Sequence, residues 1–270
     1  MNIAIITGAS SGMGEEFTKR LVADIGKYTF PSIDEIWLVA RSEKKLNELV
    51  SSLPSDKLRA VPLDLTDRAA LSAFSEKLQQ VDPGISLLIN CAGMGKSGAF
   101  ATQTLSDVDM TLDLNCTSLT ELTHICLPYM KKLGATLPKR KGPCIMNIAS
   151  SAGFLPQPNF ALYAASKAMV ISLSRAINQE LASSNISVTC ICPGPCDTNF
   201  IKVSKNDPQA TFTGFKAKFV TSVEKLIPAS LKATSARKSM LVFGMGQKAL
   251  HLASKIVPTN VILFFERKML

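Results

Sequence analysis

The sequence predicts a doubly wound α/β fold with a mostly parallel sheet of seven strands. Several short apolar runs are continuous rather than alternating, which is typical of strands buried on both faces of a parallel sheet. Helical patterns separate these runs, and a glycine-rich turn follows the first of them. The strand-like runs lie at Ile3–Ile6, Ile36–Val39, Arg59–Leu63, Leu87–Asn90, Cys144–Ile148, Val188–Cys192 and Met240–Phe243.

The expected helices connect the strands through most of the chain. They are Glu15–Ile25, Glu43–Leu53, Asp67–Gln80, Ser118–Leu133 and Tyr163–Ser183. We expect one domain over residues 1–270, because no low-complexity linker divides it. Residues 199–238 break the rhythm and are expected to form an insertion over the sheet's edge that carries substrate loops. Residues 246–270 form a C-terminal extension that is both basic and apolar.

Composition narrows the class of protein. With 46% apolar and 19% charged residues among 270, the chain is globular rather than disordered. Its seven cysteines form no CxxC pair and it has two histidines, so no metal site is predicted. The chain starts directly with a strand-like run, without a signal-peptide pattern, and no apolar run approaches about 18 residues. These features favour a reducing, cytoplasmic location.

The net charge of +9 is concentrated at one end of the sequence. Residues 202–270 contain 12 Lys and Arg against three acidic residues, whereas the charges of residues 1–201 cancel. A basic face attracts anionic substrates or acidic lipid surfaces, so peripheral membrane contact is one reading. A solvated helix surface is the other reading, and we expect no nucleic-acid partner.

The segment Thr7–Gly14 predicts a phosphate-binding turn between the first strand and the first helix. Glycines there permit a tight turn and let the backbone approach a pyrophosphate, which then lies at the helix N-terminus. The cofactor-binding residues expected in this turn are Gly8, Ser10, Ser11, Gly12, Met13 and Gly14.

Arg41 and Ser42 follow the second strand, where sites that prefer NAD usually carry an acid for the ribose 2′-hydroxyl. A guanidinium suits a 2′-phosphate instead, so these residues favour NADP(H). Ser42 is also suited to cap the next helix, with Glu43 in its first turn. The two roles are compatible.

Tyr163 and Lys167 lie four residues apart in a segment that reads as helix, and therefore share one helix face. A free phenol has a pKa of about 10, and a nearby ammonium stabilises the phenolate and lowers that pKa. The pair can therefore work as an acid and base. An exposed helix face that carries both residues by chance is the alternative.

Together these motifs resemble those of the short-chain dehydrogenase/reductase family, from residue 3 to about 200. The family's TGxxxGxG pattern matches Thr7–Gly14, and its NNAG motif appears as Asn90-Cys91-Ala92-Gly93, with cysteine in place of the second asparagine. The resemblance implies a Rossmann-type fold. It also implies further cofactor contacts at Asp64, Leu65, Asn90, Ala92, Gly93, Pro193, Gly194 and Thr198, besides Tyr163 and Lys167.

The resemblance also implies a catalytic set of Asn115, Ser150, Tyr163 and Lys167. Ser150 precedes the tyrosine by thirteen residues, as in the family, and Ser151 is the less favoured choice. In this scheme Tyr163 protonates the developing alkoxide and Ser150 hydrogen-bonds the substrate oxygen. Lys167 lowers the tyrosine pKa and holds the nicotinamide ribose, and Asn115 holds a water. Cys192 and Cys196 flank the nicotinamide loop, most simply as structural thiols.

The expected function is a ketoreductase, an oxidoreductase that interconverts a ketone and a secondary alcohol with NADP(H). A steroid, bile acid, lipid or 3-oxoacyl substrate is expected, because apolar residues frame the predicted pocket. They are Met94, Phe154, Leu155, Phe160, Phe200, Phe212, Phe215 and Phe219. A non-catalytic cofactor sensor or scaffold on the same fold is the alternative, and a nucleotide-sugar epimerase would need a larger C-terminal domain.

The sequence departs from the family at two places. Residues 26–35 lengthen the link into the second strand, and residues 246–270 extend the C-terminal end. We expect a homo-oligomer, a dimer or tetramer. The apolar block Val261–Phe265 can pack in a subunit interface, cap the substrate pocket, or lie on an anionic membrane surface.

Overall fold

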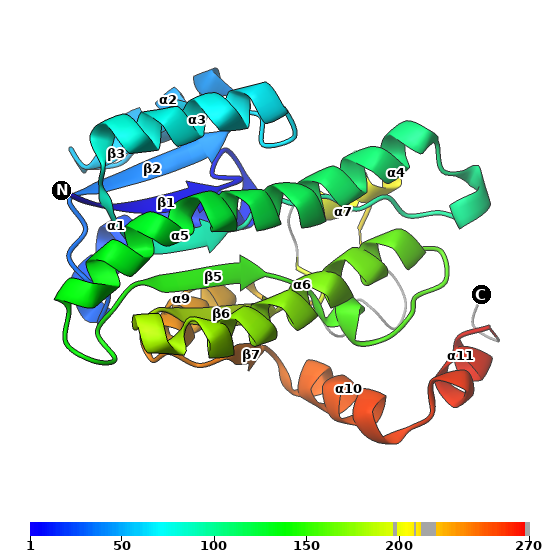
Figure 1. Ribbon diagram of the computed structural model, residues 1–270. Coiled ribbons are helices and arrows are strands. Elements are labelled where there is room, and N and C mark those ends of the chain that lie inside the picture. The colour runs from blue at the N-terminus through cyan, green and yellow to red at the C-terminus, as the bar shows by residue number, and fades with distance from the viewer. Residues whose placement is uncertain (197–198, 208, 212–219, 268–270) are drawn as a thin grey trace.

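The computed structural model describes residues 1–196, 199–207, 209–211 and 220–267. Its centre is one seven-stranded sheet in the order β3-β2-β1-β4-β5-β6-β7, with every neighbouring pair parallel (Figure 1). The strands are β1 (Asn2–Thr7), β2 (Glu35–Ala40), β3 (Leu58–Pro62), β4 (Gly84–Asn90), β5 (Cys144–Ile148), β6 (Ser187–Cys192) and β7 (Met240–Val242). The predicted doubly wound Rossmann fold with seven strands is confirmed.

Helices connect the strands in sequence. Those of the first part are α1 (Gly12–Asp24), α2 (Glu43–Ser52), α3 (Arg68–Val81), α4 (Leu105–Leu112), α5 (Ser118–Thr136) and α6 (Ala161–Glu180). Those that follow are α7 (Asn199–Lys205), α9 (Val223–Ser235), α10 (Met245–Ile256) and α11 (Thr259–Arg267). The short helical turns are η1 (Ile25–Lys27), η2 (Phe100–Thr102), η3 (Asp113–Thr117), η4 (Ser151–Phe154) and η5 (Ala182–Ser184). Among the described helices, none is long and apolar enough to cross a membrane.

Two apolar layers cover the sheet, because successive residues of a strand point to opposite faces. One layer joins alternate residues of β1 and β2 to α1, α2 and α9, with Phe17 and Leu231 fully buried. The other joins the intervening residues to α3 and α5, with Leu78 and Met130 fully buried. A smaller cluster packs α6 on β6 through Val170.

Local signals explain where several helices begin. The Ser42 hydroxyl accepts a hydrogen bond from the backbone N–H of Lys45 at 3.4 Å, so this residue caps α2 as expected. Asp67 caps α3 in the same way, through the N–H groups of Ala69 and Ala70. The long link before β2 is tied to β1, because the Asn2 N–H donates to Asp34 at 2.7 Å.

One expectation about element placement differs from the structure. Within residues 199–238 the sequence predicts an insertion over the edge of the sheet, but Val223–Ser235 forms α9, which packs in the layer with α1. Its buried residues Leu226, Ile227 and Leu231 keep helical spacing, and Pro228 lies inside the helix. Pro228 is the sixth residue of α9 and lacks a backbone N–H, so it removes one intrahelical hydrogen bond there.

Candidate active site

The polar residues that the sequence singles out lie at the carboxyl end of the sheet, where β1, β4 and β5 terminate. Carboxyl ends of parallel strands share one edge, which is where open α/β sheets bind ligands. The Thr7 hydroxyl, at the end of β1, accepts hydrogen bonds from the N–H groups of Cys91 and Ala92, each at 3.0 Å. This contact fixes the turn after β4 beside the glycine-rich turn after β1.

The glycine-rich turn has the backbone that a phosphate-binding turn needs. Gly8 and Gly12 have φ of 67° and 56°, a region that favours glycine. A Cβ on Gly14 would lie 2.6 Å from the carbonyl carbon of Gly8, so α1 and the turn approach too closely for a side chain. Among the described residues Ser11, the N-cap of α1, makes no side-chain capping hydrogen bond. The first N–H groups of α1 therefore fit a bound pyrophosphate.

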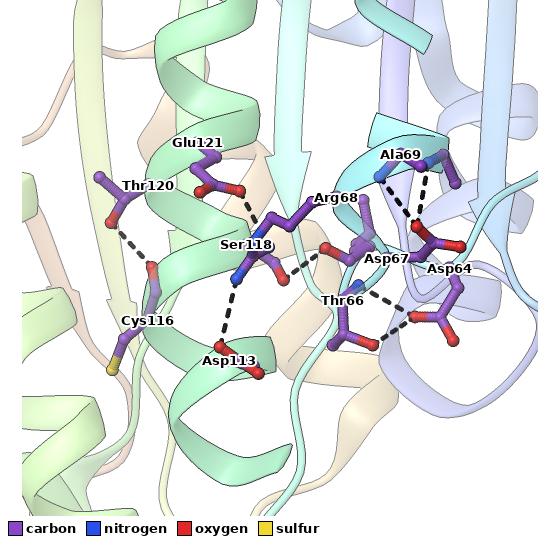
Figure 2. Close-up of polar contacts among 12 residues, drawn as sticks. Asp64, Thr66, Asp67, Arg68, Ala69, Asp113, Cys116, Ser118, Thr120 and Glu121 are labelled. Atoms are coloured by element: carbon purple, nitrogen blue, oxygen red, sulfur yellow. Dashed lines mark hydrogen bonds and ion pairs between the residues drawn. The ribbon is translucent and has the colours of Figure 1, made fainter. Parts of the chain in front are cut away.

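Asp64 and Arg41 lie near each other at the ends of β3 and β2. The Asp64 carboxylate accepts hydrogen bonds from the N–H and hydroxyl of Thr66, at 2.9 and 2.7 Å (Figure 2). Burial raises the pKa of Asp64, but the two Thr66 hydrogen bonds and the Arg41 charge lower it below its ordinary value overall. Asp64 is therefore ionised at neutral pH, and Arg41 is exposed and available to an anion.

Arg68 connects this corner to the helices beyond it. Its guanidinium pairs with Asp113 at 3.2 Å and with Glu121 at 2.9 Å (Figure 2). The Ser118 hydroxyl donates to the carbonyl of Leu65 at 2.6 Å. The loop after β3 is thus held against the start of α5, next to the turn that carries Asn115.

A chain of buried amides crosses the centre of the sheet. Asn90 donates to Asn147 at 2.8 Å and to Thr123 at 3.0 Å, and Asn147 donates to Ser174 at 2.9 Å. Satisfied buried networks of this kind fix the relative position of their elements. Asn90 therefore has a structural contact to α5 and β5, besides its expected place at the cofactor.

Tyr163, Lys167 and Ser150 converge at the N-terminal half of α6, and all three are buried. The Lys167 ammonium donates to the carbonyl of Ile148 at 2.9 Å and lies 5.7 Å from the centre of the Tyr163 ring. Gly93 leaves room for both the Lys167 and the Asn115 side chain. A Cβ at this position would lie 3.3 Å from the Lys167 nitrogen and 3.2 Å from the Asn115 side-chain oxygen.

Burial is the largest influence on the pKa values of both Tyr163 and Lys167. Burial raises the pKa of Tyr163 above its ordinary value, and the hydrogen bond with Ser150 lowers it by less. Burial also lowers the pKa of Lys167. Burial is the larger effect on both groups in this structure, in which the ammonium donates to the Ile148 carbonyl, so the role of Lys167 in lowering the tyrosine pKa stays a prediction.

Asn115 lies in a single π-helical turn, η3, between α4 and α5. Such turns are rare and occur frequently at functional sites. Both hydrogens of its side-chain amide are used, on the Met94 carbonyl at 2.7 Å and on the Ser166 hydroxyl at 3.0 Å. Its oxygen accepts from the Met94 N–H at 2.9 Å. Asn115 thus clamps the turn after β4 to α6, and only acceptor capacity is left for a water.

Two phenylalanines enclose the Tyr163 ring. Phe160 stacks on it with ring centres 4.4 Å apart, and Phe200 of α7 lies 5.3 Å from it. Gly95 completes the contact, since a Cβ there would lie 2.6 Å from the Tyr163 ring and 3.0 Å from each phenylalanine. The carbonyl of Ser204 accepts the N–H of Ser97 at 2.9 Å, which holds α7 against this loop.

Other predicted site residues lie elsewhere or outside the described part. Gly194 packs against Gln247 of α10, with a built Cβ 2.9 Å from the amide carbon, and the carbonyl of Pro193 accepts the N–H of Ser151 at 2.8 Å. Phe154 packs on His251 of α10, with ring centres 4.4 Å apart. Thr198, Phe212, Phe215 and Phe219 lie outside the described residues.

An apolar cavity of about 500 Å³ lies beside α6, but on its other side. Its lining includes Leu155, Ala161, Ala165, Ala168 and Leu263 of α11. At 100° per residue, these α6 positions lie opposite the face of Tyr163 and Lys167. The Val261–Phe265 block therefore contributes Leu263 to a cavity that Tyr163 does not face.

The thiols near the site are buried or half-buried, and burial raises the pKa of two of them. Burial raises the pKa of Cys196 to about 12 and that of Cys91 to about 12, so both are protonated and poor nucleophiles. The Cys190 and Cys192 sulfurs are 3.8 Å apart and buried. Within the described residues, no group of three or more His, Cys, Asp or Glu side chains could hold a metal.

Comparisons with known proteins agree with this geometry. A family model described as short chain dehydrogenase matches residues 2–209. Nodulation protein G of Rhizobium sp. (strain N33) is 32% identical over 191 residues, 71% of each protein. The solved structure of a short-chain dehydrogenase from Sphingobium yanoikuyae in complex with NADPH is 30% identical, with a TM-score of 0.77 over 94% of each chain.

The name of a third similar protein states the kind of substrate on which that protein acts. The bulky-bulky ketone specific alcohol dehydrogenase from Comamonas testosteroni is 27% identical, with a TM-score of 0.73 over 94% of this chain and 92% of that one. With these matches, the chain belongs to the short-chain dehydrogenase/reductase family, a family of oxidoreductase enzymes, as the sequence motifs predict.

Proposed function

We propose that this protein is an NADP(H)-dependent oxidoreductase that interconverts a ketone and a secondary alcohol on a hydrophobic substrate. The observation that carries the proposal is the convergence of Ser150, Tyr163, Lys167 and Asn115 beside the turn after β4. Each is buried, and the interaction with Ser150 lowers the pKa of Tyr163.

The cofactor fits the turns at the carboxyl edge of the sheet. The α1 N-terminus and its glycines can accommodate the pyrophosphate, and Arg41, which is exposed, can pair with a 2′-phosphate. Ala92 lies beside Thr7 at the end of β1, and Gly93 lies against the Lys167 ammonium, so the turn after β4 joins the glycine-rich turn to α6. The NADPH in the Sphingobium structure supports the same cofactor here. When bound, the nicotinamide supplies or accepts the hydride.

Side chains of the site neutralise the negative charge that hydride transfer creates on the substrate oxygen. In reduction, Tyr163 gives its hydroxyl proton to the developing alkoxide, and the tyrosinate that remains is stabilised by the Ser150 hydroxyl and the Lys167 charge. The Lys167 ammonium has three hydrogens and donates one to the Ile148 carbonyl, so two remain for a ribose hydroxyl that binds beside Gly93. Asn115 holds the loop that forms this space and accepts from a water that replenishes the proton.

The apolar neighbours of Tyr163 support a hydrophobic substrate. Phe160, Phe200 and Gly95 surround the ring, so a carbonyl that reaches its hydroxyl must lie among apolar groups. A steroid, bile acid, lipid or 3-oxoacyl chain satisfies this requirement. The name of the Comamonas relative, which is specific for bulky ketones, supports the same class.

The test is NADPH oxidation against cyclic diketones, steroids, bile acids and 3-oxoacyl thioesters. We expect turnover with at least one of these classes and little with small hydrophilic ketones. Tight NADPH binding without turnover on any of them would favour a non-catalytic cofactor sensor.

Two further properties are proposed with this function. The chain acts as a homo-oligomer, as its family resemblance implies, and light scattering of the purified protein would measure its mass. A cytoplasmic location is supported by its seven free cysteines, which suit a reducing compartment. Fractionation of cells that produce the protein would test the location.

A further inference from the structure

Helix α10 has an inner face that packs on the protein and an outer face that is apolar. Its inner face carries Gln247, Leu250, His251 and Ser254, which are buried or half-buried against the rest of the protein. Gln247 packs on Gly194 and His251 on Phe154, as described above. The outer face carries Met245, Ala249, Leu252 and Ile256, which fall within about 60° of one another around the helix.

The outer face is open to solvent. Met245 is 88% exposed, Leu252 59% and Ile256 71%. Helix α11 adds Val261 and Phe264, three residues apart, which are 44% and 56% exposed. Single exposed apolar residues are ordinary, but five large ones within 20 residues of the chain indicate an interaction surface. We call these five residues the C-terminal apolar surface.

Positive charge borders this surface. Lys248 and Lys255, seven residues apart, are both exposed and lie beside Leu252 around α10. The sequence of α10 contains no acidic residue, and residues 245–270 hold four Lys and Arg against Glu266. An apolar stripe with a basic border is the pattern of a helix that lies in the interface of an anionic bilayer.

We propose that the C-terminal apolar surface binds anionic phospholipid bilayers, with α10 lying along the bilayer surface. Charge complementarity favours lipid over a second copy of the chain, because a self-interface would bring Lys248 and Lys255 toward the same residues of the partner. Pro258 does not disturb the arrangement, since it lies between α10 and α11 rather than inside either helix. Neither helix is long enough to span the bilayer.

The position of α10 gives this binding a consequence for the enzyme, which rests on the proposed function. Its inner face contacts the turn at Gly194 and the η4 segment after Ser150, both parts of the candidate site. A bilayer bound to the outer face therefore lies one helix diameter, about 10 Å, from the loops that frame the site. A lipid-soluble ketone would reach the site from the bilayer rather than from water.

Flotation of the full-length protein with vesicles tests the proposal, without need of turnover. Vesicles of phosphatidylcholine alone are compared with vesicles that contain about one third phosphatidylglycerol. We expect binding to the anionic vesicles that weakens as salt is raised. Lys248→Glu/Lys255→Glu should weaken binding at least tenfold, since each basic residue near the surface contributes about fivefold. Leu252→Ser/Ile256→Ser should also weaken binding at least tenfold, since it removes two large apolar side chains from the surface.

The control is Lys131→Glu/Lys139→Glu, which makes the same charge change at two exposed lysines outside the surface. It should bind vesicles nearly as well as the parent, and NADPH binding by every variant confirms that it folds. Equal binding by the parent and both α10 variants would overturn the proposal. So would failure of the parent to bind, or a dimer that Leu252→Ser/Ile256→Ser dissociates, which would make the surface a self-interface.

Discussion

At the scale of single residues, two opposing effects, burial and the interaction with Ser150, determine the pKa of Tyr163. Burial raises its pKa and Ser150 lowers it, with burial the larger effect, so the phenol stays protonated at neutral pH. A protonated phenol is the form that reduction needs, whereas oxidation of an alcohol needs the tyrosinate.

The pH dependence of reduction follows from this balance. We expect the kcat/KM of ketone reduction to stay flat between about pH 6 and pH 9 and to fall at higher pH, as Tyr163 deprotonates. In Ser150→Ala the residual rate should fall at still higher pH, because the hydrogen bond that lowers the pKa is gone. A fall in the parent that begins below pH 7 would contradict this assignment of the acid.

Substitutions of Tyr163 and Lys167 should separate their roles. Tyr163→Phe should abolish turnover and leave NADPH binding nearly intact, since only the proton donor is lost. Lys167→Met should impair both, because the ammonium lies beside Tyr163 and can also reach the cofactor. Steady-state rates and NADPH titrations measure the two effects. More than a few per cent residual activity in Tyr163→Phe would mean that another residue supplies the proton.

Arg41 should set the cofactor preference. It is exposed beside Asp64, whose pKa its charge helps to lower. We expect NADPH to bind at least tenfold more tightly than NADH, because the guanidinium can pair with the 2′-phosphate. Arg41→Asp should reverse or erase this preference. Calorimetric titration of both cofactors measures it, and equal affinities in the parent would reject the role of Arg41.

The sequence could predict which polar residues gather at this site, because their motifs have fixed spacing. It could not predict the proton balance at Tyr163, since burial depends on Phe160, Phe200 and Gly95 from three separate segments. It also missed Ser166, whose hydroxyl accepts a hydrogen bond from Asn115. Only its place one turn beyond the first residues of α6 and next to Lys167 could have pointed to it.

At the scale of elements, the loop after β4 packs closely on α6 and α7 through Gly95. Gly95→Ala would force its Cβ to 2.6 Å from the Tyr163 ring, so the rings must move. We expect a loss of about 1–3 kcal/mol in stability and a larger fall in kcat than change in KM. Thermal unfolding and steady-state kinetics measure these effects.

Gly26→Ala is the matched control, because a Cβ there meets nothing within 4 Å. It should leave both the unfolding temperature and kcat close to those of the parent. If Gly95→Ala behaves like this control, the enclosure of Tyr163 by the three segments does not hold in solution.

The sequence predicted the strands well, because a short continuous apolar run between turn signals is typical of a buried strand. The strand runs match the observed strands to within a few residues, because strands buried on both faces are continuous apolar runs. The helix α9 was missed because the irregular segment before it suggested a single long insertion. The π-helical turn at Asn115 was missed because its five residues continue the helical pattern on either side.

At the scale of the whole molecule, the candidate site lies at the carboxyl edge of the sheet, and the basic C-terminal extension contacts it through α10. The extension's α10 has apolar residues on two faces, so periodicity alone cannot decide which face is buried. For the Val261–Phe265 block the sequence favours packing in an interface or at the substrate pocket over membrane contact, because Pro258 and the mixed pattern predict a poor amphipathic helix. Packing shows Leu263 at a cavity on the far side of α6 from Tyr163, and leaves the outer face of α10 exposed.

The central claim is that the site transfers a hydride from a nicotinamide to a carbonyl carbon, with Tyr163 as proton donor. The most direct measurement is the fate of deuterium from NADPH labelled at the transferable position of C4, in a reaction with the best ketone of the panel. We predict deuterium on the carbinol carbon of the product with the parent protein and none with Tyr163→Phe, although that variant still binds NADPH. An alcohol product without deuterium, or equal labelling by the variant, would contradict the account.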